Sequence, residues 1–143
     1  MILKIVKVVW FFSLLACFGV LLYVYASLQE QVTILEGAEG ISLLRDNFFY
    51  IVTATIGVMN MLAFMVNKIY PPSASPFKSW FYGLMIALNI FFIIGLSFVS
   101  LINSGEKFDY DRIGLVIYGS VGLIIVWALA WPAYTISKSF LNK

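Results

Sequence analysis

The sequence predicts an all-α integral membrane protein, in which residues 1–143 form a single domain of four transmembrane helices with both termini in the cytoplasm. Two observations predict the helices. The chain is 62% hydrophobic and only 11% charged, whereas a small soluble domain buries only about 70% of its surface. It also contains four apolar runs of roughly 20 residues or more, and a helix of that length crosses a hydrocarbon core of about 30 Å. A third observation, the placement of charges, predicts the orientation.

Acidic and basic residues are segregated along the chain. All seven acidic residues fall within residues 30–46 and 106–111. The two ends and the middle loop carry no acidic residue and six lysines: Lys4, Lys7, Lys68, Lys78, Lys138 and Lys143. Because cytoplasmic loops of membrane proteins accumulate Lys and Arg, we predict a multi-pass protein of the bacterial inner (cytoplasmic) membrane. The termini and the middle loop are expected on the cytoplasmic side.

The four predicted spans cover about residues 5–26, 48–66, 80–102 and 113–136. They leave outer loops at 27–47 and 103–112 and an inner loop at 67–79. Polar residues stand where three of the helices are expected to begin, and their side-chain oxygens can accept hydrogen bonds from the free N–H groups of a first turn. These expected caps are Asp46 for the second helix, Ser75 followed by Pro76 for the third, and Asp109 or Asp111 for the fourth.

The first outer loop has room for structure of its own. Residues 32–35 and 41–44 are two short β-prone runs, and the segment between them contains Gly37 and Gly40, which permit a tight turn. We therefore expect a short extracytoplasmic β-hairpin or a strand-like lid on the outer membrane surface. Because an isolated two-stranded hairpin is marginal in water, it should rest on the helix ends, on lipid head groups or on another protein.

Composition excludes most catalytic chemistry. The chain has no histidine, a single cysteine (Cys17), and no charged residue inside any predicted span. Histidine-ligated metals, bis-histidine haem, paired thiols and the commonest general base are therefore excluded. A charged residue at the membrane centre is the usual mark of an ion- or proton-coupling site, so its absence from the predicted spans argues against proton-coupled transport. The six lysines are spread over three segments, unlike the clustered charges that bind nucleic acid. We predict no enzyme activity, no metal, no cofactor and no nucleic-acid partner.

Two amides lie near the middle of their predicted spans, Asn60 in the second and Asn89 in the third. An amide in hydrocarbon costs several kcal/mol unless it finds hydrogen-bond partners. The plain interpretation is that the two amides bond each other or a backbone carbonyl and help the helices to associate. The alternative interpretation is a polar site for a ligand or a partner helix.

The fourth span carries the other candidate packing residues. Gly119 and Gly122 would admit the backbone of a neighbouring helix, either within the chain or from another subunit. Trp127 and Trp131 are four residues apart and share one helix face, which suits an interface belt, a ridge that packs on a partner, or a quinone or lipid site. Pro132 should kink the helix about one turn from its cytoplasmic end.

The first outer loop also carries a family resemblance. It reads Leu28-Gln29-Glu30-Gln31-Val32-Thr33-Ile34, with Gly40 further on. This segment, about residues 25–50, resembles the outer loop of the SdpI-like bacterial membrane proteins, which usually reads Leu-Pro, an acid, a polar residue, Ile or Val, and then Pro-x-His. Here Gln29 and Thr33 stand at the two proline positions and Leu35 at the histidine position. The resemblance implies a role in immunity or signalling.

These features together favour a non-enzymatic accessory or scaffolding subunit, a four-helix bundle that sits in the lipid bilayer against larger integral membrane proteins. A homo-oligomer is compatible with the same features. The alternative hypotheses are a small lipid- or quinone-binding membrane protein, which would use Asn60, Asn89 and the two tryptophans of the fourth span, and an SdpI-like immunity or signalling protein.

Overall fold

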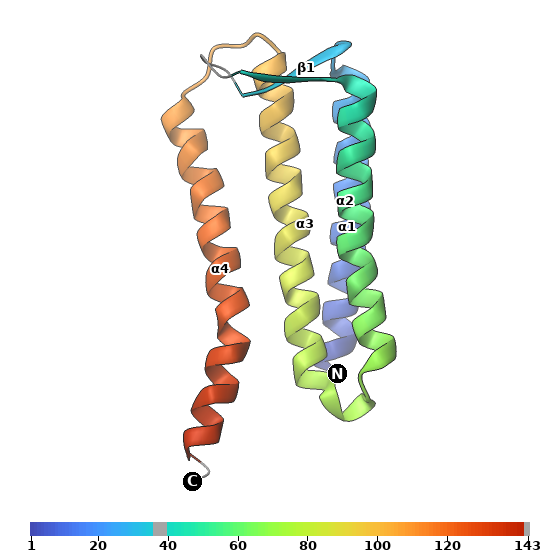
Figure 1. The fold of residues 1–143 in the computed structure, drawn as a ribbon, viewed down its shortest axis with the longest axis vertical. Coiled ribbons are helices and arrows are strands. Elements are labelled where there is room, and N and C mark those ends of the chain that lie inside the picture. The colour runs from blue at the N-terminus through green and yellow to red at the C-terminus, as the bar shows by residue number, and fades with distance from the viewer. Residues whose placement is uncertain (36–39, 142–143) are drawn as a thin grey trace.

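Four long helices and a small hairpin make up the computed structural model, which describes residues 1–35 and 40–141 (Figure 1). In chain order the elements are helix α1 (Ile2–Ser27), strands β1 (Gln31–Leu35) and β2 (Ile41–Leu44), helix α2 (Arg45–Ile69), the short 3₁₀ helix η1 (Pro72–Ala74), helix α3 (Ser75–Asn103) and helix α4 (Tyr110–Leu141). Four helices are long and apolar enough to cross a membrane, as expected of a multi-pass membrane protein. The predicted four-helix architecture is confirmed at this level.

Both chain termini lie at the end of the bundle opposite the hairpin (Figure 1). We call these two ends the termini end and the hairpin end. Each helix extends beyond its predicted span at both ends, because helical hydrogen bonding continues through residues that are too polar for the apolar run to include. The loops are correspondingly shorter than predicted.

Only one of the predicted helix caps is present. The carboxylate of Asp109 accepts a hydrogen bond from the N–H of Asp111 at 3.1 Å, at the start of α4. The predictions for α2 and α3 were wrong. Asp46 lies inside the first turn of α2 and makes no capping hydrogen bond. Ser75 is already the first residue of α3, because η1 leads directly into that helix and leaves Ala74 at the cap position.

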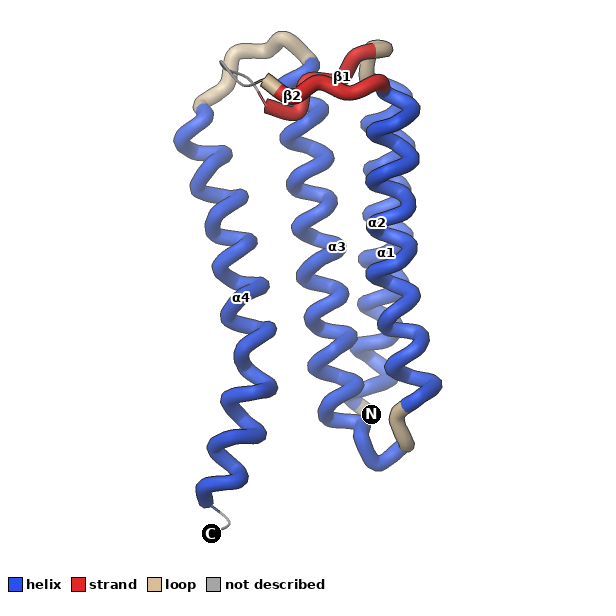
Figure 2. Tube along the Cα trace, viewed as in Figure 1, coloured by secondary structure: helices blue, strands red, loops and turns tan. Residues whose placement is uncertain are grey.

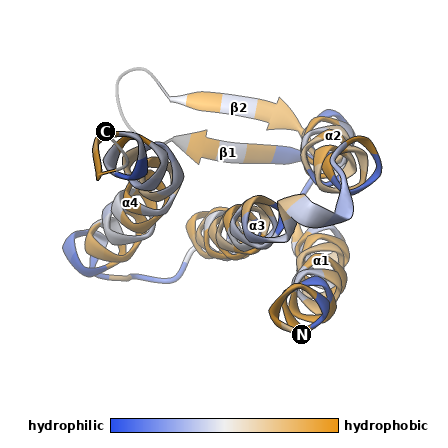
Figure 3. Cartoon of the chain, turned by 90° about the horizontal axis from the view of Figure 1, so that it is seen from below, coloured by the Kyte–Doolittle hydropathy of each residue, from blue (hydrophilic) through white to orange (hydrophobic). Residues whose placement is uncertain are grey.

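Helix α3 is the centre of the arrangement. It contacts each of the other three helices, and in the described part of the chain α4 contacts no other element. Seen along the bundle from the termini end, α1, α2 and α3 stand around a common axis, and α4 stands apart on the far side of α3 (Figure 3). The molecule therefore divides into a three-helix core and a fourth helix attached to it.

The apolar core belongs to the first three helices and the hairpin. Towards the hairpin end it contains nine buried side chains: Cys17, Leu21, Val24, Leu28, Val32, Phe48, Ile56, Leu96 and Val99. A smaller cluster towards the termini end contains Ala63, Tyr82 and Met85. No described residue of α4 is buried. Asn60 and Asn89 lie between the two apolar clusters, since each follows a member of one cluster and precedes a member of the other along its helix.

The predicted hairpin is present, and it rests on the ends of the chain's own helices (Figure 2). Strands β1 and β2 pair antiparallel with Val32 opposite Leu43, and the register is irregular between Thr33 and Leu35. Val32 is fully buried in the larger apolar cluster. Of the three supports expected for this hairpin, the structure provides the helix ends, so no partner is needed to explain its stability.

Candidate functional site

The two central amides form a hydrogen-bonded pair that links α2 to α3. Asn60 Nδ2 donates to Asn89 Oδ1 at 2.8 Å, and Asn89 Nδ2 donates to Asn60 Oδ1 at 3.0 Å. The two residues are only 5% and 1% exposed. The expected bond between the amides is therefore confirmed, in a reciprocal form in which each amide both donates and accepts.

Helix α1 completes this network. The indole N–H of Trp10 donates to Asn60 Oδ1 at 2.8 Å, and Asn89 Nδ2 donates to the hydroxyl of Ser13 at 3.0 Å. Asn60 Nδ2 also donates to the carbonyl of Ile56 at 2.9 Å. A side-chain amide has two N–H groups, and both are used at Asn60 and at Asn89. The donors of both amides are therefore used within the chain, and this arrangement joins three helices.

Two tryptophans join α3 to α4 at the termini end. The indole N–H of Trp80 donates to the carbonyl of Trp127 at 2.8 Å, and the indole N–H of Trp127 donates to the carbonyl of Trp80 at 3.1 Å. The ring of Trp131 stacks on that of Trp80 with centroids 6.0 Å apart. A Cβ atom at Gly83 would lie 2.7 Å from Cζ2 of Trp127. We call these four residues the tryptophan clasp, and with Trp127 in this position there is no room for a side chain at position 83.

The clasp changes the interpretation of Trp127 and Trp131. Both pack on α3 of the same chain, although Trp127 remains 45% exposed. Sequence reasoning missed their partners. Trp80 and Gly83 are three residues apart at the start of α3, so they lie on one face of that helix. A tryptophan beside a small residue on one face was the feature of the sequence that could have indicated a packing site there. Nothing in the sequence indicated which helix would occupy that face.

Gly119 and Gly122 have no close neighbour. A Cβ atom at either position would meet no atom within 4 Å, so neither glycine supports a helix contact within the described chain. The half-buried residues of α4 include positions 113, 117, 120, 124, 128 and 131. This helical spacing marks the seam that faces α3, and both glycines lie off it. The interpretation that they pack within the chain was wrong.

Pro132 lies inside α4, which runs without interruption to Leu141. At 3.6 residues per turn, the proline is about two and a half turns before the end of the helix, so its predicted position one turn from the end was wrong. The helix is longer than the apolar run suggested. The hydroxyl of Thr135 donates to the carbonyls of Trp131 and Pro132 at 3.1 and 2.8 Å, which adds local hydrogen bonds beside the proline.

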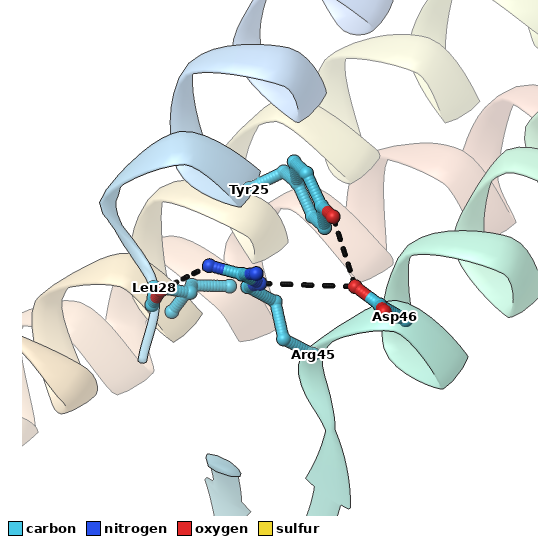
Figure 4. Close-up of polar contacts among 4 residues, drawn as sticks. All are labelled: Tyr25, Leu28, Arg45 and Asp46. Carbon is cyan, nitrogen blue, oxygen red and sulfur yellow. Dashed lines mark hydrogen bonds and ion pairs between the residues drawn. The ribbon is translucent and has the colours of Figure 1, made fainter. Parts of the chain in front are cut away.

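A polar cluster at the hairpin end ties α1 to α2 (Figure 4). The Tyr25 hydroxyl donates to the carboxylate of Asp46 at 2.8 Å, and the Arg45 guanidinium lies over the Tyr25 ring, 4.8 Å from its centroid. Arg45 also donates to the carbonyl of Leu28 at 3.3 Å. The Asp46 side chain is 62% exposed and 3.8 Å from the guanidinium, so this ion pair contributes little to stability.

Beside this cluster is an open hollow of about 410 Å³, lined by Glu30, Leu44, Arg45, Asp46, Asn47 and Tyr50. Two of its charged residues, Arg45 and Asp46, already contact each other and α1, and Arg45 Nε is buried without a hydrogen-bond partner. Residues 1–35 and 40–141 contain no group of three or more His, Cys, Asp or Glu side chains placed to hold a metal ion. The arrangement fixes the junction of α1, α2 and the hairpin.

Asn103 holds the hairpin on α3, and sequence reasoning missed it. Its side chain accepts a hydrogen bond from the N–H of Thr33 at 2.9 Å and donates to the carbonyl of Thr33 at 2.8 Å. The amide thus bonds one residue of β1 as a neighbouring strand would. Its position at the end of a predicted span could have suggested a cap, but not a partner seventy residues away.

Comparison with models of known protein families, with curated proteins and with solved structures gave no significant match. The resemblance of residues 25–50 to the SdpI-like proteins therefore stays a prediction.

Proposed function

We propose that this protein is a non-enzymatic accessory or scaffolding subunit of a larger complex in a bacterial inner membrane, and that α4 faces a transmembrane helix of the partner. The observation that carries the proposal is the contrast within α4. One side of the helix is joined to α3 by the tryptophan clasp. The other side carries Gly119 and Gly122 with open space above them, and no described residue of the helix is buried.

Small residues favour helix association in lipid, because they let two backbones approach closely and gain van der Waals contact. Exposed apolar residues alone would be normal for a lipid-facing helix, so the glycines give the proposal its specificity. The interior of the core supports the same function, since the donors of its two central amides are consumed in holding the helices together.

The charge distribution supports an orientation with both termini in the cytoplasm. Lys4, Lys7, Lys68, Lys78 and Lys138 all belong to the termini end of the helices, and cytoplasmic segments accumulate such residues. A reporter enzyme that works only outside the cytoplasm should stay inactive when fused after Lys143 and be active when inserted near Gly37. The opposite pattern would reverse the orientation.

The partner is tested by purification from the native membrane in a mild detergent. Gly119→Leu and Gly122→Leu should each release the protein from its complex without lowering its abundance, because leucine is compatible with insertion but holds a neighbouring backbone away. Gly57→Leu is the matched control, since a Cβ atom at Gly57 of α2 also meets no atom within 4 Å.

A complex recovered intact from both α4 variants would remove α4 as the contact surface. Absence of any stoichiometric partner in the wild-type preparation would contradict the subunit function itself. A quinone or lipid retained at the central amides would favour the alternative function, although the hydrogen bonds of Asn60 and Asn89 are already made within the chain.

A further inference from the structure

Two lysines from different helices meet at one residue near the termini end. Lys7 of α1 donates through Nζ to the side-chain oxygen of Asn67 at 2.5 Å. Lys78 of α3 donates through Nζ to the backbone carbonyl of the same Asn67 at 3.1 Å. Asn67 lies in the last turn of α2. Three helices therefore bring two positive charges to a single amide residue, which we call the lysine pair site.

No carboxylate of the described chain balances these charges. The acidic residues that the structure describes all lie towards the hairpin end: Glu30 before β1, Asp46 in the first turn of α2, and Glu106, Asp109 and Asp111 around the start of α4. Asn67 supplies only neutral oxygens. Lys7 Nζ also lies over the Tyr82 ring, 5.7 Å from its centroid. An ammonium group has three donors, so these neutral contacts leave both lysines without an anionic partner.

The burial of Lys78 makes this lack of counter-charge costly. Lys78 is only 5% exposed, and a buried ammonium is expensive unless it is paired. It also lies in the first turn of α3, where the helix dipole is positive and disfavours a cation. The carbonyl of Asn67, at the negative end of the α2 dipole, offsets part of this cost. An anion bound beside the two lysines would offset the rest of the cost of burying the Lys78 charge.

We propose that the lysine pair site binds the phosphate group of an anionic phospholipid. Lys7 is half-buried, so a head group can reach it, and the buried Lys78, which contacts the same Asn67, adds to the positive potential of the site. Lys4 and Lys68 are exposed at the same end of the bundle and add positive charge there. Basic pockets between transmembrane helices on the cytoplasmic side are known settings for anionic head groups, and each nearby lysine contributes about 1 kcal/mol.

A lipid fits better than a free phosphate ion because the site lies at the ends of apolar helices. Phe11 and Phe12, one turn further along α1 from Lys7, are exposed and leave an apolar surface for the acyl chains. This inference does not depend on the accessory-subunit function, because the site is built from residues of α1, α2 and α3 and none of α4.

The test measures lipid binding to the purified full-length protein by native mass spectrometry, with phosphatidylglycerol and phosphatidylcholine added in turn. Lys7→Gln should weaken phosphatidylglycerol binding about fivefold, which corresponds to about 1 kcal/mol for one lysine. Phosphatidylcholine binding should change little. Lys138→Gln is the matched control, because it removes the same charge from an exposed site on α4 at the termini end. Lys7→Arg should retain the binding.

Three outcomes would overturn the proposal. Equal weakening by Lys7→Gln and Lys138→Gln would show a diffuse surface attraction and no site. Displacement of the lipid by excess inorganic phosphate would identify a free anion as the ligand. Unchanged phosphatidylglycerol binding in Lys7→Gln and in Lys78→Gln would remove the site. Thermal unfolding of each variant in detergent establishes that it is folded, and Lys7→Gln is the primary variant because Lys78 is the more buried residue.

Discussion

The three-helix core and helix α4 are built from equally apolar sequences but are held in different ways. Helices α1, α2 and α3 share a hydrogen-bond network at mid-height and apolar clusters on either side of it. Helix α4 contributes no buried residue and is joined to α3 by the tryptophan clasp and one half-buried seam. Mean hydropathy does not distinguish α4 from the core: its most apolar window has a value of 2.3, within the range of 1.9 to 2.5 for the three core helices.

The difference shows what holds helices together in lipid. Lipid tails are as apolar as leucine, so there is no hydrophobic force between helices, and association depends on close packing and hydrogen bonds. The core has both of these along most of its length. The hydrogen bonds that the structure describes between α4 and α3 lie at the termini end, and most of the α4 surface is exposed to lipid or to a partner. Three substitutions test this comparison, one at the tryptophan clasp and two in the core.

The larger effect is expected at Gly83, because any side chain there collides with Trp127. A Cβ atom would lie 2.7 Å from Cζ2 of the indole, and overpacking of this kind costs about 1–3 kcal/mol. Gly83→Leu should separate α4 from α3 at the termini end while the core stays folded. The near-ultraviolet circular dichroism of the stacked Trp80 and Trp131 rings should fall, and thermal unfolding should begin earlier.

Gly95→Leu is the control for this substitution. It places the same side chain on α3, where a Cβ atom would meet nothing within 4 Å, and it should leave the spectrum unchanged. An unchanged spectrum and unfolding profile for Gly83→Leu would mean that the clasp does not fix α4.

A smaller effect is expected in the core. Asn60→Leu and Asn89→Leu should each lower the free energy of unfolding in detergent by about 1 kcal/mol. Asn60→Leu should lower the free energy of unfolding more than Asn89→Leu does, because it removes the hydrogen-bond acceptor of Trp10 as well as that of Asn89. The double variant should cost less than the sum of the two, since replacing both partners leaves no unpaired amide.

Thermal unfolding of the four proteins forms a double-mutant cycle. Strictly additive losses would show that the two amides act independently, and no loss at all would show that the network does not stabilise the core. Both results would remove the distinction between the polar core and the loosely held α4.

The sequence by itself determined the number and approximate place of the helices, the position of the hairpin, and the need of the two central amides for hydrogen-bond partners. These follow from local or nearly local physics. Apolar runs of sufficient length form helices in lipid, β-prone runs around two glycines form a hairpin, and an amide in hydrocarbon must find a partner. The helix bounds were too short and two caps were wrong, because the apolar pattern does not register polar residues that continue a helix.

Only the tertiary structure decided which helix faces meet. The sequence showed that Trp127 and Trp131 share a face, but not that Trp80 and Gly83 occupy it, and it could not tell that Gly119 and Gly122 point away from α3. Two further contacts could not be predicted from the sequence either. They are the hydrogen bonds of Asn103 to Thr33 and the meeting of Lys7 and Lys78 at Asn67. Each joins residues far apart in the chain, and in helices that are apolar on all sides no periodic pattern marks the face that will be covered.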